Sequence, residues 1–207
     1  MPDDKKFEKS EIDEETFLST LREAIEVMDK AGFPYVVFGG IASSVWGRPR
    51  ETRDIDFFIQ PQHADGVLEA FDSAGFDTLR KDPQWLFKAA KNKALVDIIF
   101  RSQGGIYLDE EMTARSVLKE YKSQAVKLIP AEDLLVQKAV VYEEEIPHQW
   151  HDAVAIVSQP QLDWDYLVRR AVHGTKRVLS LLVYAQSNDQ FVPNEVIRKL
   201  YEMAYQT

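Results

Sequence analysis

The stretch from residue 38 to residue 59, FGGIASSVWGRPRETRDIDFFI, constrains the fold of this chain more than any other. It sets two acids, Asp54 and Asp56, inside an apolar run that otherwise has the pattern of a buried strand. A carboxylate among isoleucine and phenylalanine side chains costs free energy unless a cation meets it. Two adjacent glycines, Gly39 and Gly40, precede the acids, and Gly and Pro punctuate the segment between. The stretch therefore predicts a strand, a turn, a short helix and a second strand.

The acids predict a metal site. Residues i and i+2 of a strand point to the same face, so Asp54 and Asp56 project side by side. A third acid, Asp97, lies in the later apolar run LVDIIF. Three carboxylates repel one another unless a cation lies among them, and Mg²⁺ or Mn²⁺ suits oxygen ligands. Two alternatives stay open: Asp97 pairs with a lysine or arginine, or Asp54 and Asp56 face solvent on an edge strand.

The glycine pair predicts an anion site beside the acids. A strand that ends in Gly39-Gly40 and opens a helix lets backbone N–H groups approach a phosphate closely. Phosphate at one end and metal-binding carboxylates at the other describe a nucleoside triphosphate site. There, two metal ions about 4 Å apart can activate a hydroxyl and stabilise the departing pyrophosphate. Taken alone, a glycine pair more often marks a tight turn.

The chain changes character at Pro130. Before it, helical and strand patterns alternate; after it, every segment has helical periodicity, with Pro, Gly, Asn or Asp at the junctions. This predicts an α+β chain with a mixed sheet-and-helix part over residues 1–130 and a helical part over 131–207. The strands are expected at residues 35–38, 54–59, 85–90, 94–100, 116–121 and 125–129.

Composition excludes several classes of protein. The 207 residues contain no cysteine, which rules out a disulfide framework and thiolate metal sites. No apolar run approaches the length of a membrane span and no signal peptide is evident, so we expect a cytoplasmic protein without a membrane partner. The net charge of −9 argues against broad binding of nucleic acid, although a short contact with an RNA end is compatible with it.

Together these motifs resemble a known superfamily. Gly39-Gly40, thirteen intervening residues, Asp54-Ile55-Asp56 and a later Asp97 resemble the signature of the polymerase-β-like nucleotidyltransferases. Within it, GRPRETRDID, IPAEDLLVQKAV and HDAVAIV are most similar to AbiEii-type toxins and related uncharacterised bacterial nucleotidyltransferases. The resemblance covers residues 33 to 160. It implies a small, mixed, twisted sheet with flanking helices as the catalytic domain, followed by a C-terminal helical bundle.

The resemblance also implies roles for individual residues. Asp54 and Asp56 would bind the divalent ions, and Asp97 would complete the metal site and help deprotonate the acceptor hydroxyl. Gly39 and Gly40 would hold the triphosphate, and since many members have serine at the position of Gly40, Ser43 or Ser44 would supply the hydroxyl. The other candidates for nucleotide contact or a supporting role are Arg53, Lys138, Arg50 and Asp152. The structural alternative is that the arginines offset nearby acids and that Lys138 extends from a helix core.

The implied activity is that of a nucleotidyltransferase. With Mg²⁺ or Mn²⁺, and two ions expected, it would transfer a nucleoside monophosphate from an NTP to a hydroxyl and release pyrophosphate. The acceptor is a tRNA or other RNA end, a protein or a small molecule. Two other functions stay open: a module that binds nucleotide without turning it over, and one half of a toxin–antitoxin pair whose partner is a cognate antitoxin.

Overall fold

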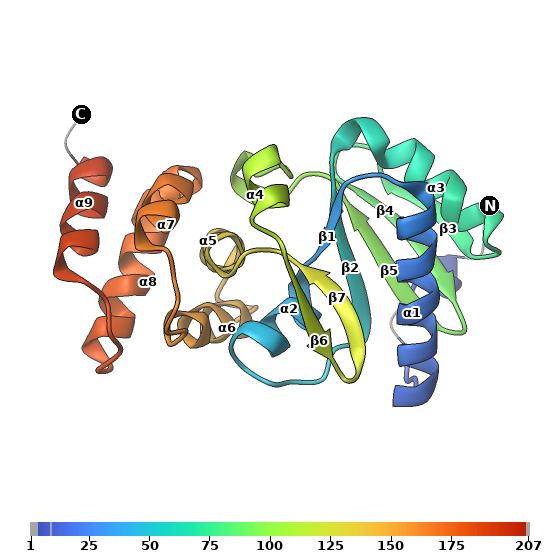
Figure 1. Ribbon diagram of the computed structural model, residues 1–207, viewed down its shortest axis with the longest axis horizontal. Coiled ribbons are helices and arrows are strands. Elements are labelled where there is room, and N and C mark those ends of the chain that lie inside the picture. Colours follow the sequence, from blue (N-terminus) through green and yellow to red (C-terminus); the bar gives the residue numbers. More distant parts are fainter. Residues whose placement is uncertain (1–3, 9, 206–207) are drawn as a thin grey trace. The chain divides into compact units, whose positions relative to one another are not determined.

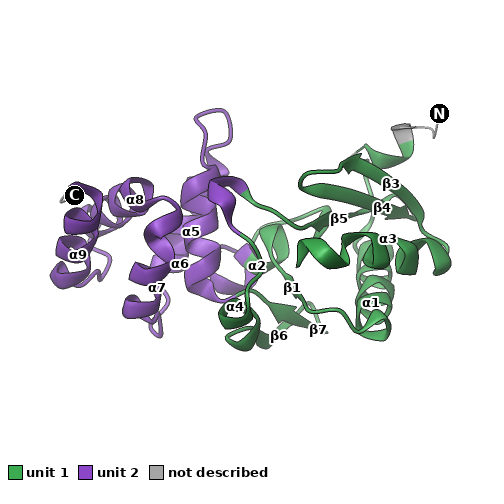
Figure 2. Ribbon diagram, turned by 90° about the horizontal axis from the view of Figure 1, so that it is seen from above, with its two compact units in different colours: residues 1–42, 50–102, 107–129 green, residues 43–49, 103–106, 130–207 purple. Residues whose placement is uncertain are grey.

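The computed structural model describes residues 4–8 and 10–205, and Figure 1 shows its helices and strands. The chain divides into two compact units, which Figure 2 colours separately. The sheet unit comprises Met1–Ala42, Arg50–Ser102 and Tyr107–Ile129. The helical unit comprises Ser43–Pro49, Gln103–Ile106 and Pro130–Thr207. The division into a catalytic domain and a helical domain at residue 130 stays a prediction.

A seven-stranded mixed sheet forms the centre of the sheet unit, in the order β3-β4-β5-β2-β1-β7-β6. The β1–β7 and β2–β5 pairs are parallel, and all other neighbours are antiparallel. This confirms the expected small mixed sheet. The strands are β1 (Tyr35–Val37), β2 (Asp54–Ile59), β3 (Asp77–Asp82), β4 (Leu86–Lys91), β5 (Ala94–Ile99), β6 (Val117–Tyr121) and β7 (Gln124–Leu128).

Two helices, α1 (Glu14–Ala31) and α3 (Ala64–Ser73), pack against each other and against the sheet. The Asp13 side chain begins α1 by accepting a hydrogen bond from the backbone N–H of Thr16 at 2.8 Å. Gly32, with a left-handed φ of +72°, ends it. Apolar side chains of α1 are buried at helical spacing. Two shorter helices, α2 (Gly39–Trp46) and α4 (Glu110–Ala114), connect strands.

The helical unit is built around α5 (Ala131–Val141). Every residue from 131 to 139 is buried, because α5 packs against α6, α7 and α8. Helix α9 packs in turn against α7 and α8. The predicted C-terminal bundle is therefore confirmed. Its outer helices are α6 (His148–Val157), α7 (Trp164–Arg170), α8 (Thr175–Ser187) and α9 (Asn194–Tyr205).

Within residues 4–8 and 10–205, no helix combines the length and the apolar character that crossing a bilayer requires.

Candidate active site

The three predicted acids lie on one face of two neighbouring strands. Strands β2 and β5 run parallel, with Asp56 directly opposite Asp97. Residues opposite each other in a sheet point to the same side, and Asp54 joins them because it lies two positions before Asp56. All three side chains are half-buried. Ile55 and Phe57, which alternate with the acids, are fully buried. The sequence pattern thus predicted which residues share this face.

A lysine that the sequence analysis did not single out lies next to the acids. Lys88 on β4 is opposite Asp97 in the antiparallel β4–β5 pair. Its Nζ lies 2.6 Å from Asp97 Oδ1, and the two side chains are 15% and 19% exposed. Asp56, Asp97 and Lys88 therefore form a row across β2, β5 and β4. The only signal in the sequence was one charge inside the apolar segment WLFKAA.

The glycine turn lies directly against the Asp56 carboxylate. Strand β1 ends at Val37, and α2 begins at Gly39, whose φ is +57°. The Gly40 backbone N–H donates to Asp56 Oδ2 at 3.4 Å. A Cβ atom added to Gly39 would lie only 2.0 Å from the same oxygen. Position 39 therefore requires glycine for two reasons, its backbone conformation and its approach to the acid. An anion at the start of α2 would lie beside the carboxylates.

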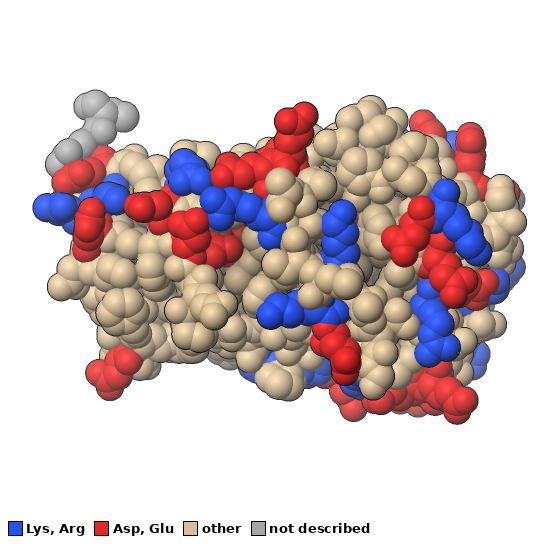
Figure 3. Space-filling model, in the orientation of Figure 1, with Lys and Arg blue, Asp and Glu red and all other residues tan. Residues whose placement is uncertain are grey.

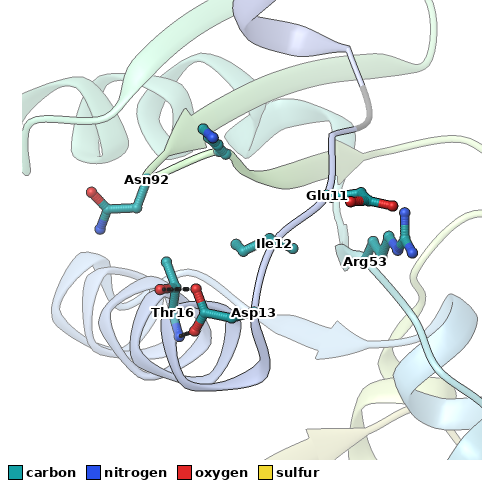
Figure 4. A pocket seen from close by; sticks show the side chains of 7 residues that line it. Glu11, Ile12, Asp13, Thr16, Arg53 and Asn92 are labelled. Atoms are coloured by element: carbon teal, nitrogen blue, oxygen red, sulfur yellow. Dashed lines mark hydrogen bonds between the residues drawn. The ribbon is translucent and has the colours of Figure 1, made fainter.

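Arg50 and Arg53 lie in the segment between α2 and β2. Arg50 is half-buried, and its Nη1 donates to the backbone oxygen of Glu51 at 3.3 Å. Arg53 is exposed and lines an open pocket with a volume of about 550 Å³ (Figure 4). The pocket lies between the start of α1 and the β4–β5 turn, and the residues that line it do not include the three acids. The other lining residues are Glu11, Ile12, Asp13, Thr16, Asn92 and Lys93.

The remaining candidates, Ser43, Lys138 and Asp152, belong to the helical unit. The Ser43 side chain is fully buried in α2. Lys138 on α5 donates from Nζ to Asp152 Oδ2 on α6 at 3.2 Å, with side-chain exposures of 5% and 0%. Lys138 and Asp152 therefore bind each other inside this unit, and their role in nucleotide binding stays a prediction.

The acid face fits a metal that is held jointly by protein and substrate. Among the residues that the structure describes, no three His, Cys, Asp or Glu side chains are arranged to hold an ion by themselves. Asp54 and Asp56 nevertheless offer two carboxylates on one face, beside an N–H-rich helix start. Mg²⁺ is usually bound by one or two carboxylates together with substrate phosphates and water, so this donor set suits it.

Comparison with solved structures shows the fold. The antibiotic-resistance factor ANT(2'')-Ia matches with a TM-score of 0.51 at 13% identity, covering 83% of this chain and 94% of that one. A nucleotidyltransferase-like protein from Paracoccidioides brasiliensis matches with a TM-score of 0.51 at 13% identity, covering 92% and 97%. These matches confirm the nucleotidyltransferase-type fold that the sequence predicts.

Family membership follows from the sequence itself. No curated protein matches the chain significantly. Residues 17–174, which include the glycine turn and all three acids, match the family described as "Nucleotidyl transferase of unknown function (DUF2204)". The predicted superfamily is confirmed, and the narrower similarity to AbiEii-type toxins stays a resemblance. This chain belongs to that family of nucleotidyl transferases.

Proposed function

We propose that the chain transfers a nucleoside monophosphate from an Mg²⁺-bound NTP to a hydroxyl acceptor. One observation carries the proposal: the Gly39-Gly40 turn at the start of α2 contacts Asp56, which is paired across the sheet with Asp97. An anion-binding helix start and a set of carboxylates therefore meet at one place. The carboxylates favour a divalent metal ion, and the helix start favours an anion such as triphosphate.

Each residue has a defined task in this reaction. The backbone N–H groups at Gly39 and Gly40 hold the phosphates of the NTP. Asp54 and Asp56 would hold the divalent ion, which would neutralise charge on the phosphates. Asp97 accepts the proton of the acceptor hydroxyl while the oxygen of that hydroxyl bonds to the α-phosphorus of the NTP. The bond from the α-phosphorus to the bridging oxygen breaks, and pyrophosphate leaves with that oxygen. Catalysis is then mainly positioning and charge stabilisation.

The acceptor is the open part of the proposal. On the face drawn in Figure 3, basic side chains are scattered among acidic ones, which suits a compact acceptor better than a long nucleic acid. A separate crystal structure of ANT(2'')-Ia holds adenylyl-2''-tobramycin, so an aminoglycoside hydroxyl belongs among the candidates with a tRNA end and a protein hydroxyl. A cognate antitoxin stays a candidate partner, tested by co-purification from the native host.

Transfer of label tests the proposal. Each of four α-labelled NTPs is incubated with Mg²⁺ and, in turn, tRNA, an aminoglycoside, a protein lysate or the protein alone. We expect label in one acceptor class and none with the Asp54→Asn, Asp56→Asn double variant. The matched control is Asp65→Asn, which changes an exposed aspartate on α3 that pairs with Arg80 at 2.8 Å. It should transfer label at the wild-type rate.

Two outcomes contradict the proposal. Label that persists in the double variant removes the two acids from the mechanism. NTP binding by calorimetry without label in any acceptor favours the module that binds nucleotide and does not turn it over.

A further inference from the structure

Thr52 fills the space where a side chain at position 40 would lie. A Cβ atom added to Gly40 would lie 2.3 Å from Thr52 Oγ1 and 2.7 Å from Thr52 Cβ. Real Cβ atoms do not approach other heavy atoms this closely, and the short, branched threonine side chain cannot swing far away. Only one of the two positions can therefore carry a side chain in this arrangement. In this chain it is position 52.

The hydroxyl of Thr52 therefore lies at the start of α2, beside the candidate triphosphate site. Gly40 is the residue whose backbone N–H donates to Asp56 Oδ2. Thr52 is half-buried, and its hydroxyl donates to the backbone oxygen of Asp54 at 3.3 Å, which ties it to the first residue of β2. This bond is long, and a hydroxyl rotates about its C–O bond to reach a stronger acceptor. A phosphate oxygen is such an acceptor, because it is charged.

A cationic side chain, that of Arg50, borders the same space. Arg50 Nη2 lies 3.5 Å from the position of the added Cβ on Gly40, so the guanidinium borders the same space. Guanidinium groups suit phosphate because they donate several hydrogen bonds in one plane. Of the two serines to which the sequence analysis assigned the hydroxyl, Ser43 is fully buried and Ser44 is half-buried.

We propose that Thr52 donates its hydroxyl to the bound triphosphate, in place of a side chain at position 40, with Arg50 as the neighbouring cation. The inference rests on the proposed function, because it assumes that the triphosphate binds at the start of α2. It adds a binding residue and explains why position 40 has glycine. It also predicts that the hydroxyl can be moved from position 52 to position 40.

Binding of inorganic triphosphate with Mg²⁺, measured by calorimetry, tests the inference without knowledge of the base. Thr52→Val keeps the shape and removes the hydroxyl, and we expect binding about 10- to 100-fold weaker, the effect of one hydrogen bond to a charged group. Thr52→Ser keeps the hydroxyl and should bind within about threefold of wild type. The matched control, Thr78→Val, removes a half-buried hydroxyl on the edge strand β3, where it bonds Asp72, and should leave binding unchanged.

Moving the hydroxyl gives the sharper test. Gly40→Ser alone introduces the clash, so we expect weak binding and a lower melting temperature. Thr52→Gly alone removes the hydroxyl and should bind weakly. The double variant Gly40→Ser, Thr52→Gly restores one hydroxyl to the same space and should bind at least about tenfold more tightly than Thr52→Gly. If the double variant does not fold, the triphosphate affinities of Thr52→Val and Thr52→Ser decide whether the hydroxyl takes part in binding.

The outcomes separate this inference from the proposed function. Equal binding by wild type and Thr52→Val overturns the role of Thr52 and leaves the transferase proposal intact. Weak binding by Thr52→Val together with the absence of transfer from any NTP by wild type supports Thr52 and contradicts the transferase proposal. A wild-type protein that does not bind triphosphate overturns the inference.

Discussion

The sheet unit and the helical unit both pair aspartate with lysine, but they do so in different surroundings. Asp97 and Lys88 are 19% and 15% exposed, whereas Asp152 and Lys138 are 0% and 5% exposed. A partly exposed carboxylate can exchange its lysine for a metal ion at small cost, since water reaches both groups. A fully enclosed pair cannot part without leaving a buried charge. From this difference we expect chemistry at the first carboxylate and a contribution to stability from the second.

Other buried acids of the helical unit follow the second pattern. Asp133 on α5 accepts hydrogen bonds at 2.5 Å from the Tyr166 hydroxyl and from Arg170 Nε, both on α7. Glu132 accepts from the backbone N–H of Asp163 at 2.7 Å. These contacts join α5 to α7 and to the residue that begins α7. These two buried acids therefore help to hold α5 and α7 together.

The largest expected effect is on activity, at Asp56. Asp56→Asn removes one negative charge from the acid face and should lower the rate of nucleotide transfer on the order of 1,000-fold. Its melting temperature should stay at the wild-type value or rise, because repulsion with Asp97 is relieved. Rates of label transfer and thermal unfolding measure the two effects. A variant that loses stability in proportion to activity would place Asp56 with the structural acids of the helical unit.

The next effect is on stability, at Asp152. Asp152→Asn leaves the buried Lys138 ammonium without its carboxylate and should lower the free energy of unfolding by about 3–5 kcal/mol, measured in urea. Lys138→Met combined with Asp152→Leu should recover part of this loss, because neither charge of this pair remains buried. A stable Asp152→Asn protein that binds NTP poorly would instead support the predicted functional role of these two residues.

An intermediate effect is expected at Lys88. Lys88→Met keeps the aliphatic stem and removes the ammonium, which should lower the free energy of unfolding by about 1–3 kcal/mol. Mg²⁺ should then stabilise the variant more than it stabilises wild type, because Asp97 has lost its lysine. Melting temperatures with and without Mg²⁺ measure this. Lys119→Met, on the exposed edge strand β6, is the control. Equal stabilisation of Lys88→Met and wild type by Mg²⁺ would show that Asp97 does not take a metal.

The smallest effect is expected at Asp13, which is exposed. Hydrogen bonds from the Thr16 backbone N–H and, secondarily, its hydroxyl lower the pKa of Asp13 below its ordinary value of 3.8. A lowered pKa in the folded state means that the contribution to stability is complete above pH 3.8 and is lost as the pH falls through the folded pKa. Thermal unfolding of Asp13→Ala should therefore differ slightly from wild type at neutral pH and converge with it in acid. Asp13→Asn keeps the helix cap, and its melting temperature should not converge with that of wild type in acid in this way.

The sequence was most informative where local rules decide the structure. The spacing of Asp54 and Asp56 predicted their common face, because side chains two residues apart on a strand point the same way. Strand β3, DTLRKD, was missed because it lies at the edge of the sheet and none of its residues is buried, so it lacks apolar alternation.

Contacts that depend on register or on the path of a loop were not predictable. Lys88 faces Asp97 only because β4 and β5 pair in one particular register. Thr52 approaches Gly40 because the segment from residue 47 to residue 53 returns to the start of α2. Neither relation leaves a periodic signal in the sequence. The grouping of the three acids was predictable from the sequence, whereas the residues that border them are identified only by the structure.

The position of β1 between β2 and β7 has a consequence for synthesis of the protein. Val37 pairs with Phe57 on one side and with Leu128 on the other, and the Ile129 N–H donates to the Val37 carbonyl. The strand that leads into the glycine turn thus gains its second neighbour only after about 90 further residues have left the ribosome. During those seconds of translation, one edge of β1 is open.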